Sequence, residues 1–138
     1  MDDSNVQYPT YVYVILYGKR IKALIDSEAS RSLINVQVVR SIPQLHNAVI
    51  RPSRHQHMPS VDGSKIALQG DLFVHMNFGG YHAQVGVTIC EVLFVPLILG
   101  IDFMLSEKAL LDYDLQVLRM GAQEIPLYVS NIKFRSYP

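Results

Sequence analysis

The 138-residue sequence is poor in cysteine and in long apolar runs. Its only cysteine is Cys90, so no disulfide can form within the chain, and an intracellular, reducing compartment (cytoplasm or nucleus) is expected. No stretch approaches the roughly 18 consecutive apolar residues of a membrane-spanning helix. The start of the chain, MDDSNVQYPT, is acidic and polar, unlike a signal peptide. These features exclude a disulfide-stabilised secreted scaffold and predict no membrane partner.

Charge is also scarce, and it is balanced. Charged residues make up 17% of the chain, and 12 Lys and Arg against 12 Asp and Glu leave no net charge. Nucleic-acid-binding domains usually carry a basic excess, so we expect no nucleic-acid partner. A local basic patch formed by Arg51, Arg54, His55 and His57 remains an alternative. The low charge suggests that a protein partner covers part of the surface. The length corresponds to one domain.

Short extended runs dominate the pattern. Residues 11–17 (YVYVILY) form a β-branched and aromatic run that predicts a strand, and residues 20–26 alternate as its hairpin partner. Further strands are expected over residues 72–78, 81–89 and 125–129, a central buried element over 90–99, and short helices capped by Asn35 and over 101–108. The spacing predicts an all-β fold, a small closed barrel with one or two short helices.

One segment carries the chemistry. An apolar strand, Ala23-Leu24-Ile25, delivers the carboxylate of Asp26 into a loop of small residues. A catalytic aspartate is presented in this way at the end of a rigid element. The same pattern also fits an ordinary aspartate that caps a turn.

Two later segments extend this pattern to a resemblance with the retropepsin-like aspartic proteases, especially those of Ty3/gypsy-type retrotransposons and genes derived from them. In that family a hydrophobic strand leads into D-[TS]-G-A-S, a flap with an A-D-G-S-like tip follows, and I-L-G-x-D-F-L comes later. The corresponding residues here are Ile25-Asp26-Ser27-Glu28-Ala29-Ser30, Val61-Asp62-Gly63-Ser64 and Ile98-Leu99-Gly100-Ile101-Asp102-Phe103. The resemblance covers about residues 10–128. It implies a single retropepsin-like domain over 1–138 with a flexible N-terminus over 1–8.

The resemblance implies a catalytic dyad shared between two chains. Two aspartates share a proton and activate a water, because two close like charges cannot both ionise. This chain has one such motif, so a complete site needs a symmetric homodimer with Asp26 from each protomer. The hydroxyl of Ser27 then reaches across the dimer and holds the two loops together, and residues 128–134 are the candidate interface strand.

The remaining motif residues have supporting roles under the same resemblance. Val61, Asp62, Gly63 and Ser64 form the flap that closes over an extended peptide. The small residues Ala29 and Ser30 complete the aspartate loop. Leu99 and Gly100 pack beneath that loop and allow its close approach.

Glu28 departs from the family pattern, which has glycine at this position. Glycine allows close approach because it lacks a Cβ, whereas Glu28 adds bulk and, in a dimer, two carboxylates. A like charge ~5 Å away at an effective dielectric of ~20 contributes about 3 kcal/mol of repulsion. If Glu28 instead rotates outward, only the steric effect remains. Glu28 therefore predicts a catalytically impaired domain that serves a larger protein as a homodimerisation or peptide-binding module. The alternative is an active homodimeric aspartic endopeptidase.

No metal and no cofactor are expected. His55-Gln56-His57 places two imidazoles on one face of a strand, which supplies only part of a zinc site, and no cysteine lies nearby. Cys90 is interpreted as a small core residue. Lys19, Arg20 and Lys22 are interpreted as the solvated face of a hairpin.

Overall fold

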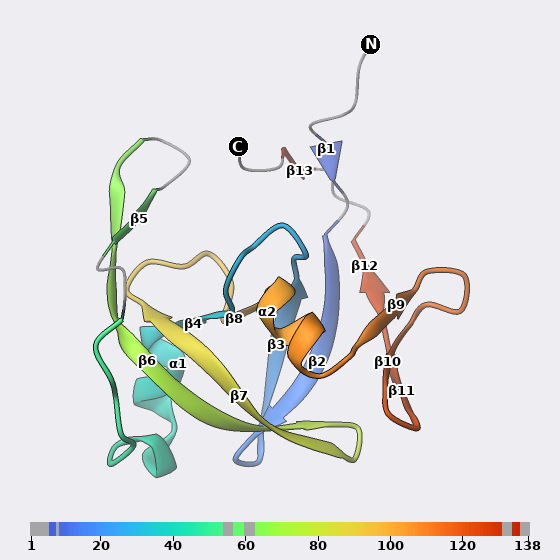
Figure 1. The fold of residues 1–138 in the computed structure, drawn as a ribbon, viewed down its shortest axis with the longest axis horizontal. Helices are drawn as coiled ribbons and strands as arrows, with labels where there is room; N and C mark the ends of the chain where they lie inside the picture. Colours follow the sequence, from blue (N-terminus) through green and yellow to red (C-terminus); the bar gives the residue numbers. More distant parts are fainter. Residues whose placement is uncertain (1–5, 8, 54–56, 60–62, 131–133, 136–138) are drawn as a thin grey trace.

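The computed structural model describes residues 6–7, 9–53, 57–59, 63–130 and 134–135 (Figure 1). Its strands are β1 (Val6–Gln7), β2 (Thr10–Leu16), β3 (Lys19–Ile25), β4 (Leu33–Asn35), β5 (His57–Pro59), β6 (Lys65–Phe78), β7 (Tyr81–Cys90), β8 (Leu97–Leu99), β9 (Leu110–Asp112), β10 (Val117–Met120), β11 (Gln123–Pro126), β12 (Tyr128–Val129) and β13 (Phe134–Arg135). The helices are α1 (Val36–Ser41), the 3₁₀ turn η1 (Pro43–Leu45) and α2 (Ile101–Ser106).

The main sheet closes into a barrel. Its strand order is β12-β2-β3-β8-β4-β7-β6-β5, and an additional pairing of Ile15 with Asn77 joins β2 to β6. The strands β2, β3, β8, β4, β7 and β6 therefore form a closed ring. The predicted all-β barrel with short helices is confirmed.

The β2–β3 hairpin follows from its sequence pattern. Alternate residues of β2 are buried, with Val12, Val14 and Leu16 fully enclosed. Tyr17 and Gly18 both have positive φ, the backbone that tight two-residue hairpin turns require. The predicted hairpin is confirmed, with its turn one residue earlier than expected.

A long ribbon of β6 and β7 forms the opposite wall. It turns at Gly79 and Gly80, which both have positive φ, as the pattern predicted. The register shifts between Leu68 and Gly70, and a Cβ on Gly70 would lie 2.7 Å from the carbonyl oxygen of Arg51. The bulge therefore admits the backbone that precedes the flap.

The helix α1 begins where the sequence predicted it. The side chain of Asn35 accepts a hydrogen bond from the Gln37 amide at 2.8 Å, which satisfies one of the free N–H groups of the first turn. The helix ends before Pro43, which begins η1. Val36 and Val39 face the core.

The predicted buried element over residues 90–99 is wrong. Only Cys90, at the end of β7, and β8 lie in strands, whereas 91–96 form a loop in which the side chains of Val92 and Phe94 are 68% and 58% exposed. Pro96 has no N–H for a sheet ladder. The loop is held instead by Asn35, whose side-chain amide donates to Leu93 O at 3.0 Å. The apolar composition of this segment therefore does not mean that its side chains are buried.

The last predicted strand, over residues 125–129, is two strands. β11 pairs with β10, and β12 pairs with β2. Pro126 interrupts the run, and the amide of Leu127 donates instead to Gln116 O at 2.9 Å. The terminal segments meet, because β1 pairs with β13. The segment 1–8, which was expected to be flexible, includes β1, and residues 1–5 and 8 lie outside the described residues. No described helix is long and apolar enough to span a membrane.

Candidate active site

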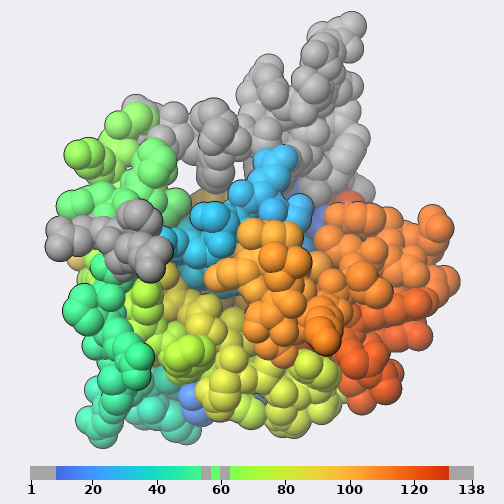
Figure 2. All heavy atoms as spheres, viewed as in Figure 1, coloured from blue at the N-terminus to red at the C-terminus, as the bar shows by residue number. Residues whose placement is uncertain are grey.

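Asp26 follows directly on β3, in a loop fixed by backbone hydrogen bonds. The amide of Asp26 donates to Leu99 O at 3.0 Å, and the amide of Ala29 donates to Asp26 O at 3.1 Å. The amide of Glu28 donates to the carboxylate oxygen Oδ1 of Asp26 at 3.0 Å. Asp26 is half-buried, and Ser27 and Glu28 are exposed. The backbone bonds therefore hold the carboxylate in a defined position. Figure 2 shows the light-blue part of the chain, which includes this loop, on the surface of the molecule.

β8 lies beside the strand that carries Asp26. It runs parallel to β3, with Ile25 opposite Leu99, and antiparallel to β4 on its other side. The chain then passes beneath the aspartate loop at Gly100, where an added Cβ would lie 2.6 Å from Ala29 O and 2.8 Å from Arg31 O. The amide of Ile101 donates to Ala29 O at 2.8 Å. Leu99 and Gly100 thus contact the loop through the backbone, and Gly100 is required for space.

A buried serine joins this loop to α2. Ser32 is only 1% exposed. Its amide donates to Oδ2 of Asp102 at 3.0 Å, and its hydroxyl donates to Oδ1 of Asp102 at 2.8 Å. The same hydroxyl accepts from the amide of Gly100 at 3.0 Å. Asp102 belongs to the third motif, which predicted no role for it, and no motif pointed to Ser32. The signal was a small hydroxyl residue that follows the aspartate loop directly.

The backbone at Glu28 does not require glycine. The non-glycine residues with positive φ in the described part of the chain are Tyr17, Lys108 and Gln116. Glu28 keeps ordinary φ and still donates its amide to Asp26. Any obstruction by Glu28 therefore arises from its side chain and not from a distorted loop.

The flap residues lie between two paired strands. β5 pairs antiparallel with the start of β6, with His57 opposite Ala67 and Pro59 opposite Lys65. Gly63 is exposed with a φ of +87°, a turn conformation that favours glycine, and Ser64 leads into β6. Val61 and Asp62 lie outside the described residues.

An apolar wall connects the flap to the aspartate loop. Leu24, Leu33 and Ile98 form a small buried cluster that is separate from the main core. The partly buried residues packed against it are Tyr11, Ala29, Met58, Leu93 and Val95. Met58 belongs to β5 and Ala29 to the aspartate loop, so both border the same apolar surface.

The other candidate chemistry is not assembled around Asp26. Among the described residues, no three His, Cys, Asp or Glu side chains come close enough to hold a metal ion. His57 is exposed, while Arg54, His55 and Gln56 lie outside the described part. Burial raises the pKa of the Cys90 thiol, and the charge of Glu91 raises it further against a lowering hydrogen bond to Val92 O. Cys90 is fully buried, as predicted, and is a poor nucleophile.

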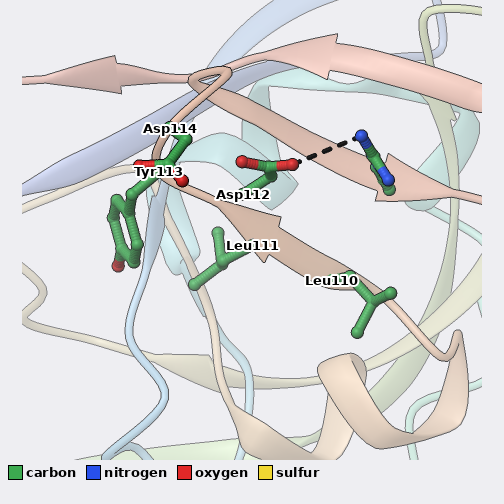
Figure 3. A pocket seen from close by; sticks show the side chains of 6 residues that line it. Leu110, Leu111, Asp112, Tyr113 and Asp114 are labelled. Carbon is green, nitrogen blue, oxygen red and sulfur yellow. Dashed lines mark ion pairs between the residues drawn. The ribbon is translucent and has the colours of Figure 1, made fainter.

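Two surface cavities lie among the described residues, and the second borders the aspartate loop at Ser30. One, of about 350 Å³, is lined by Leu110, Leu111, Asp112, Tyr113, Asp114 and Arg119 (Figure 3). Arg119 forms an ion pair with Asp112 there, at 3.3 Å between Nη2 and Oδ2. The other, of about 880 Å³, includes Ser30 and Arg31 beside Phe73. Neither is lined by Asp26.

The comparisons with solved structures identify the fold. No protein-family model and no curated protein sequence matches the chain. The retroviral protease-like domain of Ddi1 from Leishmania major superposes with a TM-score of 0.76 at 18% identity, covering 91% of this chain and 98% of that one. The EIAV protease, solved with the inhibitor HBY-793, gives 0.59 at 16% identity, covering 77% and 93%. A retropepsin-like aspartic protease from Rickettsia conorii gives 0.51 at 14% identity, covering 91% and 94%.

The chain therefore has the fold of the retropepsin-like aspartic proteases. The resemblance inferred from the three motifs is confirmed at the level of fold.

Proposed function

We propose that this chain is a catalytically impaired retropepsin-like domain that acts as a homodimerisation or peptide-binding module of a larger protein. The observation that carries the proposal is the position of Glu28. Its amide is bonded to the carboxylate of Asp26, so its side chain starts from the same short loop, two residues further along. The glycine of the family pattern would leave that space open.

A homodimer follows from the presence of one aspartate loop per chain. Ser27 and Glu28 are exposed, so a second copy can approach the loop. A two-fold axis at this loop brings two Asp26 and two Glu28 side chains together, and carboxylates that lie close together repel one another. β12 offers a further contact surface, because Tyr128 and Val129 are 49% and 41% exposed at the edge of the main sheet.

Peptide binding needs no intact dyad. The flap strand β5 lies at the other edge of the sheet, where an extended peptide can add as a further strand. The partly buried Met58, Leu93 and Val95, which pack against the buried cluster of Leu24, Leu33 and Ile98, supply contacts for its side chains. The module can therefore hold a peptide without cutting it.

An active homodimeric aspartic endopeptidase is the second candidate. It is favoured by the order within the aspartate loop, where Asp26 keeps its contacts with Leu99 O and the Glu28 amide. The two candidates differ in whether the side chain of Glu28 leaves room for substrate and water between the two loops.

The test is cleavage of an unstructured peptide library between about pH 4 and 7, where a carboxyl dyad works, at matched dimer concentration. We expect no appreciable cleavage by the unmodified protein and a gain in Glu28→Gly. Asp26→Asn serves as the blank. Glu28→Gln separates charge from bulk, because it keeps the size and removes the charge. Cleavage by the unmodified protein that is lost in Asp26→Asn would falsify the proposal that the domain is catalytically impaired.

The dimer is tested separately by light scattering. A single species of twice the chain mass at micromolar concentration supports the proposal, and a monomer contradicts it. Substitution of the exposed Tyr128 by Ser shifts the equilibrium toward monomer if β12 lies in the interface. The matched control is Tyr113→Ser, because Tyr113 is similarly exposed but lies between β9 and β10.

A further inference from the structure

Two imidazoles meet on the outer face of the β6–β7 ribbon. His75 lies on β6 opposite Gln84, and His82 lies on β7 opposite Asn77, so the two histidines are diagonal neighbours on one face. Nε2 of His75 lies 2.9 Å from Nδ1 of His82, and the rings stack with centroids 5.1 Å apart. The pair stands near the Gly79-Gly80 turn, at the end of β6 away from the flap (Figure 1).

We propose that His75 and His82 form a binding site for a divalent first-row transition cation of the Cu²⁺ or Ni²⁺ class. Metal–imidazole bonds are about 2.0 Å long, so two nitrogens bound side by side at a right angle lie about 2.8 Å apart, whereas a tetrahedral pair lies about 3.3 Å apart. The two nitrogens share a hydrogen bond at 2.9 Å. This separation is close to that of the right-angle arrangement, which square-planar Cu²⁺ and Ni²⁺ prefer. Water completes the coordination, because His82 is exposed.

When the cation replaces the proton shared by the two rings, the rings have to turn about their Cβ–Cγ bonds so that both lone pairs point to one centre. The ladder of the ribbon fixes the spacing of the two strands that carry them. The ribbon is a rigid support, since Val74, Met76, Ala83 and Val85 anchor its inner face in the core.

Gln84 supports His75 from the other side. Its side-chain amide lies 3.3 Å from Nδ1 of His75. A ligating imidazole normally donates its second N–H to an acceptor, which fixes the tautomer. Rotation of the Gln84 amide by half a turn presents its carbonyl oxygen to Nδ1, which then carries the proton while Nε2 is free for the cation. Gln84 is thus a positioning residue for the site.

The experiment is calorimetric titration of the full chain with Cu²⁺ or Ni²⁺ in a non-coordinating buffer. We expect one tight site per chain, weakened by about tenfold or more in His75→Gln and in His82→Gln, the range seen when metal sites are disturbed. The controls are His46→Gln and His57→Gln, two exposed histidines outside the pair, whose affinity should equal that of the unmodified protein. Gln84→Leu should weaken binding, and Gln84→Glu, which keeps an acceptor oxygen, should preserve it.

The spectrum of the Cu²⁺ complex provides the second measurement. Electron paramagnetic resonance should show coupling to two imidazole nitrogens, and this should fall to one in His82→Gln. Binding that is unchanged in both His75→Gln and His82→Gln, or lost in His57→Gln, overturns the proposal. None of these readouts depends on Asp26, so the outcome is independent of the proposed function.

Discussion

The clamp between Ser32 and Asp102 gives a sharp test of how the aspartate loop is held. Asp102→Ala removes the acceptor for two donors of Ser32, one from the backbone and one from the hydroxyl. Hydrogen bonds to ionised groups contribute about 1.5–3 kcal/mol each. Because Asp102 itself is exposed, solvent screening places each bond at or below the lower end of that range. We therefore expect a loss of about 2 kcal/mol of unfolding free energy.

For a domain of this size, that loss corresponds to a fall in Tm of about 8 °C. The assay is urea unfolding followed by circular dichroism, with thermal unfolding as the second measurement. Asp102→Asn keeps one acceptor oxygen of similar geometry and should lose about half as much. The matched control is Asp114→Ala, because Asp114 is an exposed aspartate in the turn between β9 and β10.

The reasoning is refuted if Asp102→Ala and Asp114→Ala unfold at the same urea concentration. It is also refuted if Asp102→Asn is as damaging as Asp102→Ala, because the loss would then follow from the charge alone. A full loss in Asp102→Ala, about half that loss in Asp102→Asn and none in Asp114→Ala, together with faster hydrogen exchange at the Ser32 amide in Asp102→Ala, supports the clamp.

Three further predictions follow from contacts in the same molecule. Gly100→Ala should destabilise the fold by about 1–3 kcal/mol in urea unfolding, because the added Cβ meets two backbone carbonyls; an unchanged midpoint would show that the loop yields freely. Cys90 should react with iodoacetamide only after denaturant is added, since burial raises the pKa of its thiol; rapid labelling of the native protein would contradict this. The hydrogen bond from Tyr81 to Glu107, with burial and the charge of Glu107, raises the pKa of Tyr81. The hydrogen bond therefore contributes fully to the free energy of unfolding below about pH 10, and this contribution is lost as the pH rises through the raised pKa of Tyr81. Tyr81→Phe should unfold at a lower urea concentration than the unmodified protein at pH 8, and the difference should disappear at higher pH. An equal difference at both pH values would exclude this explanation.

The sequence predicted the parts of the fold that depend on local rules. The β2–β3 hairpin, the Asn35 cap and the Gly79-Gly80 turn each follow from backbone preference or short-range periodicity. The order of the three retropepsin-like motifs supplied the topology, which no local rule contains. Together these were enough to predict the barrel that the solved structures confirm.

The missed features depend on contacts between distant segments. β4 is only three residues long, and it is a strand because β7 and β8 lie on either side of it. The role of Ser32 becomes visible only when Asp102 is beside it. The loop at 91–96 is apolar, yet two of its large side chains face solvent, and composition could not reveal that. Burial in these places is decided by tertiary pairing and not by residue type.

The parallel pairing of β3 with β8 sets the order in which parts of this chain can fold during synthesis. Ala23 is synthesised 74 residues before its partner Leu97. Contacts between residues so distant in sequence form slowly, because the chain loses the entropy of closing a long loop before any hydrogen bond stabilises the closed state. A nascent or truncated chain that ends before β8 has no Leu99 carbonyl to receive the Asp26 amide. Such a fragment can form the β2–β3 hairpin, but its aspartate loop is not held in place until β8 has been synthesised.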